Sequence, residues 1–285
     1  MDPTTRRELT LPEKEEKLAQ LLTGCGKALV AFSGGADSTF LLHRAVSLLG
    51  AHRVLAVTAA SPIRAAAETE AACALAAELA APHRLLRTAE LSRKPFLENR
   101  PDRCYHCKEE LCRRLGELVA AGSFDCILDG ANFDDLAEYR PGTAAARACG
   151  IRSPLQEAAL SKAEIRLLSR RDRLPTWNRP AESCLATRFP YGEKLEQAKL
   201  ARVEQAELYL RSLGLRQEIR VRSRGDSARI EVVPAELALL WENRAAVSAR
   251  LRKSGFTDVA VDLEGYSPGR ADRGREAPDT AAGPR

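Results

Sequence analysis

The first half of the chain alternates short apolar segments with longer segments of helical periodicity, and this alternation constrains the fold more than any other feature. Four strands are expected at 27–32, 54–58, 83–88 and 124–129, and four helices at 12–22, 39–49, 65–80 and 107–121. Strands that alternate with helices in this way form a parallel sheet covered on both faces. We therefore predict an α/β fold with a doubly wound, mostly parallel sheet.

The pattern changes after residue 151 and indicates a second, smaller domain. A helix at 161–171 opens with the Ser161 and Glu164 pair of a capping box, and a long loop with three prolines follows at 174–193. A C-terminal α+β domain is expected from a helix at 196–213, strands at 218–223 and 228–233, a helix at 234–253 and a strand at 256–263. The predicted organisation is a flexible leader (1–12), a sheet domain (13–172), a loop or linker that carries Cys184 (173–195), the α+β domain (196–266) and a disordered tail (267–285).

Composition narrows the class of protein. The 285 residues are 45% hydrophobic and 29% charged, which is the balance of a globular protein with a buried core. No apolar stretch reaches the ~18 residues of a membrane helix, and the charged N-terminal segment lacks the apolar core of a secretory signal. We expect a cytoplasmic protein without a membrane partner and with reduced cysteines. A net charge of +5 with 5% aromatic residues suits small anionic ligands better than a nucleic acid.

The sequence Ser33-Gly34-Gly35-Ala36-Asp37-Ser38 lies between an expected strand and an expected helix. Its glycines let the backbone approach a ligand, and the N–H groups and positive dipole end of a helix N-terminus favour an anion. Asp37 would repel phosphate unless Mg²⁺ bridges the two, so we expect this ion beside Asp37. The loop lacks the ending of a Walker A motif and the spacing of a dinucleotide fingerprint. A tight strand–helix turn without a ligand is the alternative interpretation.

Three cysteines stand apart from the other five. Cys104 and Cys107 form a CxxC pair, and Cys184 lies in the long loop near Arg188, whose positive charge would lower the thiol pKa. The CxxC pair suits a metal centre, with zinc, a redox disulfide or two non-functional thiols as alternatives. A buried loop cysteine is the alternative for Cys184. We expect the others to be small buried hydrophobes: Cys25, Cys73, Cys112, Cys126 and Cys149.

The expected strand at 218–223 carries arginines at every second position, so Arg220 and Arg222 share one face. Glu231 adds a carboxylate from the next strand. Guanidinium groups bind phosphate and carboxylate, but an alternating polar face is also typical of a solvated antiparallel sheet, and both interpretations stay open. Glu207 in the preceding helix is a weak candidate, because helical glutamates mostly face water.

The SGGxDS pattern after an apolar strand resembles the PP-loop of the ATP pyrophosphatases, which cleave ATP between its α- and β-phosphates and adenylylate a substrate. The resemblance implies a HUP-like sheet domain with ATP and Mg²⁺ as ligands. The pyrophosphate end of ATP would contact Ser33, Gly34, Gly35, Asp37 and Ser38. Thr58 and its neighbours would border the adenine, and Asp129 and Gly130 would line the same crevice at the carboxyl ends of the strands.

Four further stretches are similar to the LarE family of ATP-dependent sulfur transferases. They are 99–108, 130–135 with Arg140-Pro141-Gly142, 183–192 and 261–266, and the resemblance extends from about residue 13 to 268. LarE proteins adenylylate and thiolate the carboxylates of pyridinium-3,5-biscarboxylic acid mononucleotide, for the nickel-pincer cofactor of lactate racemase and related enzymes. The resemblance implies the same substrate and activity here, and a homo-oligomer, either a trimer or a hexamer.

The LarE resemblance also implies roles for single residues. Cys184 matches the sulfur-donor position, with Arg188 beside it. Some LarE proteins give up the sulfur of this cysteine, whereas others hold a [4Fe–4S] cluster on three cysteines and pass on a sulfur bound to the open iron. Cys104 and Cys107 favour the cluster, with Cys184 as the third ligand. Arg220, Arg222 and Glu231 become candidate substrate contacts.

Three other functions stay open. Thiolation of a tRNA base would call for a basic or RNA-binding face, which the composition does not indicate. Ammonia-dependent amidation uses the same adenylate and needs no cysteine at position 184. A non-catalytic nucleotide-binding module would bind ATP without releasing pyrophosphate.

Overall fold

The computed structural model describes residues 9–122, 124–137, 141–180 and 183–267. The chain divides into two compact units, 1–184 and 185–285. Most of the predicted leader and tail lie outside the described residues, as does Arg140 of the second LarE-like stretch. Among the helices that are described, none has both the length and the apolar character needed to cross a bilayer.

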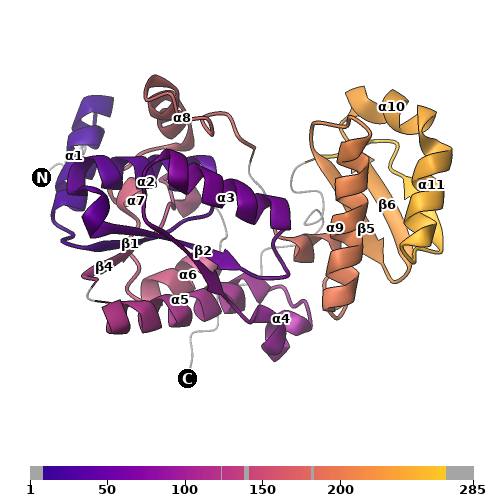
Figure 1. Ribbon diagram of the computed structural model, residues 1–285, viewed down its shortest axis with the longest axis horizontal. Coiled ribbons are helices and arrows are strands. Elements are labelled where there is room, and N and C mark those ends of the chain that lie inside the picture. The colour runs from indigo at the N-terminus through magenta and orange to yellow at the C-terminus, as the bar shows by residue number, and fades with distance from the viewer. Residues whose placement is uncertain (1–8, 123, 138–140, 181–182, 268–285) are drawn as a thin grey trace, which may run out of the picture. The chain divides into compact units, whose positions relative to one another are not determined.

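The first unit is built on a parallel sheet, which confirms the predicted fold class. Within the described residues its four strands are β1 (Ala28–Ala31), β2 (Val54–Ala60), β3 (His83–Arg87) and β4 (Cys126–Leu128), in the order β3-β2-β1-β4 (Figure 1). Ala28 of β1 is in register with Val54 on one side and with Cys126 on the other. The chain therefore crosses from one side of β1 to the other, and ligands of such sheets bind at this switch point, beyond the carboxyl ends of the strands.

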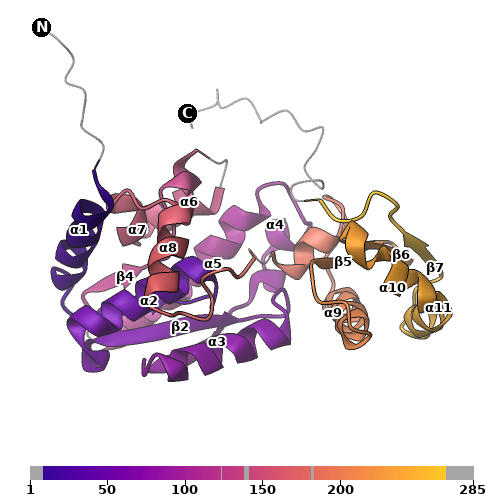
Figure 2. The same ribbon diagram turned by 90° about the horizontal axis from the view of Figure 1, so that it is seen from above.

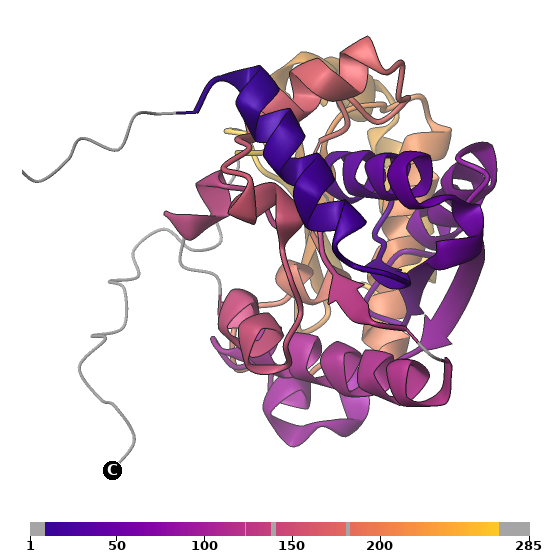
Figure 3. The ribbon, with the colours of Figure 1, turned by 90° about the vertical axis from the view of Figure 1, so that its left-hand side faces the viewer.

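Helices cover both faces of this sheet, as the alternation of apolar segments predicts. On one face lie α1 (Leu11–Thr23), α2 (Ala36–Leu49), α3 (Ala66–Glu78) and α8 (Lys162–Arg171), and on the other α5 (Arg103–Gly122) and α6 (Pro141–Ala148) (Figures 2 and 3). Val30 packs with Leu18 and Phe40 under the first layer. Leu29, the preceding residue of β1, packs with Leu115 and Ile127 under the second. The period-two alternation of a strand thus supplies two cores from one short segment.

Helix α5 begins four residues earlier than the expected helix at 107–121. Its apolar periodicity is confined to the later turns, where Cys112 and Leu115 are buried, so the polar first turn carries no such signal. Cys104 and Cys107 consequently lie on the first helical turn rather than in a preceding loop. Three short helices were also missed: α4 (Lys94–Leu97), α6 (Pro141–Ala148) and α7 (Pro154–Glu157).

The second unit pairs a hairpin with one parallel strand. Within the described residues, β5 (Ile219–Arg224) pairs antiparallel with β6 (Ser227–Val232), which pairs parallel with β7 (Asp258–Val261); α9 (Gln197–Ser212) precedes them. The single helix expected at 234–253 is wrong, because it divides into α10 (Leu237–Glu242) and α11 (Arg244–Lys253) at Asn243. The Asn243 amide donates to the carbonyl of Leu239 at 2.8 Å and so competes with backbone hydrogen bonding.

Glu164 joins α8 to α1 and gives a prediction for stability. Its carboxylate caps α8 through Ser161 and binds the Lys14 ammonium at 2.8 and 3.0 Å. Burial alone would raise the pKa of Glu164, but Lys14 and Ser161 more than offset it, and the pKa lies below its ordinary value.

We expect Glu164→Gln to lower the free energy of unfolding by about 1–2 kcal/mol at pH 7. Because the folded-state pKa is depressed, the contribution is present above the unfolded-state value and is lost as pH falls through the folded one. The gap between the variants should therefore narrow in urea titrations as pH falls below about 4.5, the ordinary pKa of a glutamate. Glu15→Gln is the matched control, since its ion pair with the half-exposed Arg171 joins the same helices at the surface and should contribute little.

Candidate active site

The loop from Ser33 to Ser38 joins the end of β1 to the start of α2. Gly34 adopts a positive φ of 75°, and Gly35 is the N-cap residue of α2. The hydroxyl groups of Ser33 and Ser38 lie 2.9 Å apart and hydrogen bond across the loop. The loop thus wraps the N-terminus of a fourteen-residue helix, whose first N–H groups and dipole favour a bound anion.

Two glycines fix this loop by close packing. A Cβ on Gly34 would come within 3.1 Å of the Ala72 side chain of α3 and 3.2 Å of its Cα. A Cβ on Gly130, just after β4, would come within 2.9 Å of the Ser38 backbone nitrogen. Only glycine fits at either position without moving backbone, so β4 and α3 together hold the loop.

A cavity of about 730 Å³ opens at the carboxyl ends of the strands of the first unit. It brings together most of the residues predicted for ATP and metal binding: Ser33, Gly35, Asp37, Ser38, Cys104, Cys107, Asp129, Gly130 and Cys184. Thr58 is fully buried and does not line the cavity, because its hydroxyl donates to the Phe32 carbonyl at 2.8 Å. Its strand neighbours Val57 and Ala59 line the cavity instead, as the alternation of side chains in β2 requires.

Asp37 carries the strongest indication of a cation site. One carboxylate oxygen, Oδ2, accepts from the Lys162 ammonium at 2.7 Å and from the Asn132 amide at 3.1 Å. The other, Oδ1, is buried and has no hydrogen-bond partner among the described residues. A buried carboxylate oxygen without a donor is costly, and a divalent cation bridging it to phosphate would satisfy it.

Asp129 lies across the cavity at the end of β4. Its carboxylate accepts from the Lys108 ammonium at 2.8 Å and from the Ser153 hydroxyl at 2.7 Å. Burial alone would raise the pKa of Asp129, but Lys108 and Ser153 stabilise the carboxylate, and the pKa lies below its ordinary value. The residue therefore stays ionised and holds Lys108 in the cavity.

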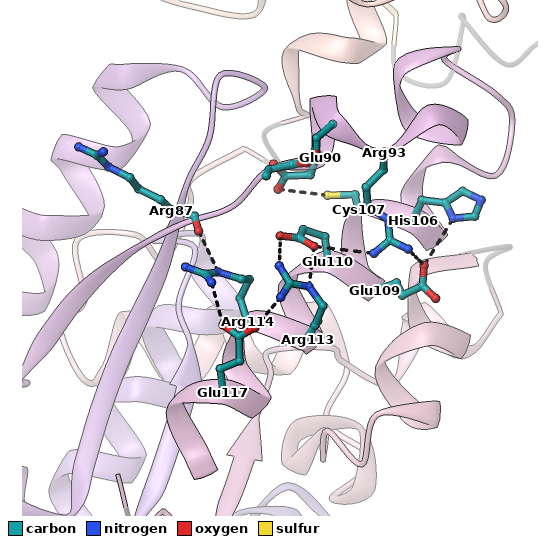
Figure 4. A network of polar contacts seen from close by, with 12 residues as sticks. Arg87, Glu90, Arg93, His106, Cys107, Glu109, Glu110, Arg113, Arg114 and Glu117 are labelled. Carbon is teal, nitrogen blue, oxygen red and sulfur yellow. Dashed lines mark hydrogen bonds and ion pairs between the residues drawn. The ribbon is translucent and has the colours of Figure 1, made fainter. Parts of the chain in front are cut away.

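The cysteines of the cavity meet a buried carboxylate. The Cys107 thiol points to Glu90 Oε1 at 4.0 Å, and Ser61 donates to the other oxygen of Glu90 at 2.6 Å (Figure 4). Burial raises the pKa of Cys107, and the nearby Glu90, Cys184 and Cys104 raise it further. Negative charge on one thiol thus opposes charge on the others, so a cation or a metal cluster would stabilise the thiolates together.

His106 does not join the cysteines. Its ring lies between Asp102 and Glu109, at 3.4 and 3.6 Å, and points away from Cys107 (Figure 4). Within the described residues, no three His, Cys, Asp or Glu side chains are grouped around the position of one metal ion. This arrangement gives no support to zinc held by the CxxC pair with His106 as the fourth ligand.

Burial of the other five cysteines agrees only in part with the expectation that all are buried. Cys25 and Cys112 are buried, and Cys73 and Cys126 are half-buried. Cys149 is exposed, so the expectation of a buried hydrophobe is wrong there; the residue directly follows the end of α6.

The remaining predicted site residues lie in the second unit and are held by ion pairs. Arg188 is 4% exposed, and its guanidinium donates to both oxygens of Glu207 at 2.8 and 2.9 Å. Glu207 also accepts from the backbone N–H of Val221. The expectation that Glu207 faces water is wrong, because this helical glutamate is the buried counterion of Arg188.

The polar face of the hairpin is buried at Glu231 and Arg220, whereas Arg229 is half-exposed. Glu231 is 1% exposed and accepts from Arg222 at 2.9 Å and from Arg229 at 2.8 Å. Arg222 also donates to the Thr187 carbonyl at 2.9 Å, and Arg220 stacks on Tyr266 and pairs with Glu218. Since Arg220 is only 4% exposed, the solvated interpretation of this face fails there.

Sequence reasoning missed several charged groups of the cavity. They are Arg64, Glu90, Lys108, Lys162 and Arg179. We call residues 33–38 the phosphate loop. Arg64 donates to its Ser33 carbonyl, and Arg179 donates to its Gly34 carbonyl. Lys108 lies four residues after Cys104, one helical turn away, and that spacing is a signal that could have found it. The others come from loops or from a helix start, where no periodicity points to them.

A Ser-Gly-Gly-Ala-Asp-Ser loop at a helix N-terminus, beyond the switch point of a parallel sheet, is the arrangement of a PP-loop protein of the α/β class. No family model matches the chain. An uncharacterised protein of Synechocystis is 42% identical over 92% of this chain and 98% of its own length. The pyridinium-3,5-bisthiocarboxylic acid mononucleotide synthase of Lactiplantibacillus plantarum is 38% identical over 92% of this chain and 94% of its own. The chain belongs to the LarE family.

The packing of Gly130 gives a sharp test of the loop. We expect Gly130→Ala to weaken ATP binding roughly tenfold or more, since the new methyl group must displace the Ser38 backbone by which the loop faces its ligand. Isothermal titration calorimetry measures the change. Gly116→Ala is the control, because no atom lies within 4 Å of its Cβ position in α5 and an alanine there should stabilise the helix by about 0.5–1 kcal/mol. Equal ATP affinity in both variants would contradict the assigned role of Gly130.

The buried pair in the second unit gives a test of stability. Glu207→Ala leaves the Arg188 charge buried without its carboxylate, and we expect a loss of about 3–5 kcal/mol in the free energy of unfolding. The double variant Arg188→Met with Glu207→Leu removes both charges and should recover most of that loss. Chemical denaturation of the three proteins provides the comparison, and a double variant as unstable as the single one would argue against the pair.

Proposed function

We propose that this chain is a pyridinium-3,5-bisthiocarboxylic acid mononucleotide synthase. It activates the carboxylates of pyridinium-3,5-biscarboxylic acid mononucleotide with ATP and replaces their oxygen by sulfur, for a nickel-pincer cofactor. The observation that carries the proposal is the placement of Cys184 on the same cavity as the phosphate loop, in a chain that matches the plantarum synthase over nearly its whole length.

The activation step follows from the loop and its charges. The backbone of 33–38 and the hydroxyl groups of Ser33 and Ser38 bind the β- and γ-phosphates. A substrate carboxylate oxygen attacks the α-phosphorus, the bond to the β-phosphate oxygen breaks, and pyrophosphate leaves. Lys162 and Arg179 offset the charge on the departing group, while Mg²⁺ would bind Asp37 through its unsatisfied Oδ1.

Activation by adenylate makes a poor electrophile reactive. The acyl–adenylate has AMP as its leaving group, so a sulfur nucleophile can attack the acyl carbon and expel AMP, leaving a thiocarboxylate. Cys184 is the cysteine proposed to act at this step. Arg188, Arg220, Arg222 and Glu231 are proposed to orient the anionic groups of the mononucleotide, since their guanidinium and carboxylate groups are already fixed by ion pairs.

For the sulfur source we propose a [4Fe–4S] cluster on Cys104, Cys107 and Cys184. The donor set fits a cluster, because three thiols line one cavity. Cys104 and Cys184 raise the pKa of Cys107, so a positively charged metal centre would stabilise the three thiolates together. Cluster thiolates bind different irons, so they need not converge on one point as ligands of a single ion do. When bound, the cluster would offer its open iron to an external sulfide. As the family resemblance implies, the working form is proposed to be a cytoplasmic trimer or hexamer.

The test is anaerobic incubation of the purified full chain with ATP, Mg²⁺, sulfide and the mononucleotide. Pyrophosphate, thiolated product and intact mass are measured together. We expect pyrophosphate release and several turnovers at unchanged mass in the wild type. Asp37→Asn should lose pyrophosphate release, whereas Cys184→Ser should retain it and lose thiolation.

A sacrificial cysteine, amidation and a non-catalytic module each predict a different result. Loss of one H₂S from Cys184 at a single turnover would replace the cluster by a sacrificial cysteine. Amidated product formed from ammonia and unaffected in Cys184→Ser would overturn sulfur transfer itself. ATP binding without pyrophosphate release would reduce the chain to a nucleotide-binding module.

A further inference from the structure

A second group of cysteines lies at the end of the sheet opposite the cavity. Cys25 is in the turn between α1 and β1, and Cys126 is the first residue of β4. β1 and β4 are parallel, with Ala28 opposite Cys126, so both cysteines stand at the amino ends of these strands. Neither residue lines the cavity, and the proposed function uses neither.

The backbone holds the two cysteines side by side. The Asp125 backbone N–H donates to the Lys27 carbonyl at 2.8 Å, and the Asp125 carboxylate accepts from the Lys27 N–H at 2.7 Å. Gly26 completes the turn with a positive φ of 61°, where a Cβ would fall 2.3 Å from that carboxylate. This clamp fixes the turn to the start of β4, so the proximity of the thiols does not depend on flexible side chains alone.

The two sulfur atoms have unlike surroundings. Cys126 donates to the Cys25 carbonyl at 3.5 Å, and its proximity lowers the pKa of the Cys25 thiol. The Arg152 guanidinium donates to the Cys25 sulfur at 3.5 Å. From α1, the group facing Cys25 is the Leu21 carbonyl, at 3.3 Å. Cys25 therefore receives a hydrogen bond from Arg152 that favours its thiolate, whereas the Cys126 sulfur accepts none from the described residues.

The charged neighbours act in the same direction. The hydrogen bond from Cys126 and the positive charge of Arg152 lower the pKa of Cys25 to about 7, against the opposing effects of burial and of Glu157. The pKa of Cys126 is raised by the Cys25 thiol, by burial and by the nearby Asp125. Glu157 accepts from Arg152 at 2.8 Å and keeps the guanidinium in place. Near neutral pH Cys25 is thus partly ionised, whereas Cys126 stays a thiol.

We infer that Cys25 and Cys126 form a thiol-modification site, which a hydroperoxide converts reversibly to a disulfide. The Cys25 thiolate attacks the peroxide oxygen, breaks the O–O bond and becomes a sulfenic acid, while the peroxide is reduced to water or an alcohol. The Cys126 thiol then attacks the Cys25 sulfur, an S–S bond forms and water leaves. A dithiol reductant returns both thiols by exchange.

A second cysteine pair provides an internal comparison. Cys112 and Cys149 are also neighbours, but burial and Cys149 raise the pKa of Cys112 to about 12. Each pair brings two thiols near one another, and the pKa of the first thiol differs between the pairs. If proximity alone decided oxidation, both pairs would close at similar rates.

The experiment uses the reduced full chain and hydrogen peroxide between pH 5.5 and 8.5. Samples are quenched with N-ethylmaleimide, digested with trypsin without reductant and analysed by mass spectrometry. Peptide 18–27 contains Cys25 alone and peptide 115–147, which runs through the uncleaved Arg140–Pro141 bond, contains Cys126 alone, so their cross-link is unambiguous; peptides 109–113 and 148–152 report on the other pair. We expect the first cross-link to form faster than the second, with a rate that rises through about pH 7, because the thiolate of Cys25 forms above its pKa.

Two variants distinguish the role of Cys126 as the second thiol from the role of Arg152 in favouring the Cys25 thiolate. Cys126→Ser should abolish the cross-link and let a cyclic 1,3-dione label a sulfenic acid at Cys25, and Arg152→Gln should slow cross-linking severalfold at pH 7. Dithiothreitol should reverse the disulfide. Cross-linking of 18–27 to 115–147 that is absent, no faster than the second pair, or unchanged in rate across this pH range would overturn the inference.

Discussion

The close approach of Gly130 to the backbone of Ser38 is the constraint on which the site depends. It sets the end of β4 directly against the phosphate loop at the switch point of the sheet. Asp129, directly before Gly130, then lines the cavity. Asn132, two residues after Gly130, donates to Asp37. A bulkier residue at 130 would push the end of β4 away from the phosphate loop. The absence of a side chain at Gly130 therefore determines how the polar groups of the two segments meet.

Two carboxylates of the cavity are each paired with a lysine. Asp37 holds Lys162 and Asp129 holds Lys108, at 2.7 and 2.8 Å. The lysines are fixed before any ligand arrives, so little reorganisation is needed when a triphosphate brings negative charge. The second unit follows the same rule with Arg188 on Glu207 and Arg222 on Glu231. Such pairs add little net stability, but they keep charged groups in one defined position.

Sequence patterns were sufficient for the sheet and the phosphate loop. Period-two and helical apolar spacing identified the strands of the first unit and the helices α1, α2, α3 and α8, because burial on one face leaves a regular signal. Asn243 broke a predicted helix through one side-chain hydrogen bond, and no periodicity records such a competition. Glu90 and Lys162 escaped notice for a related reason. Each contributes through tertiary contacts with residues distant in sequence, Cys107 and Asp37 among them.

The hydrogen bond from Arg179 to the Gly34 carbonyl spans the chain from the long proline-rich loop to the phosphate loop. Cys184 lies five residues beyond Arg179, within the same loop. The loop 33–38 thus supports the Arg179 end of the loop that carries Cys184. In the proposed function, the segment that binds the departing pyrophosphate therefore also anchors the loop from which sulfur transfer is proposed to start.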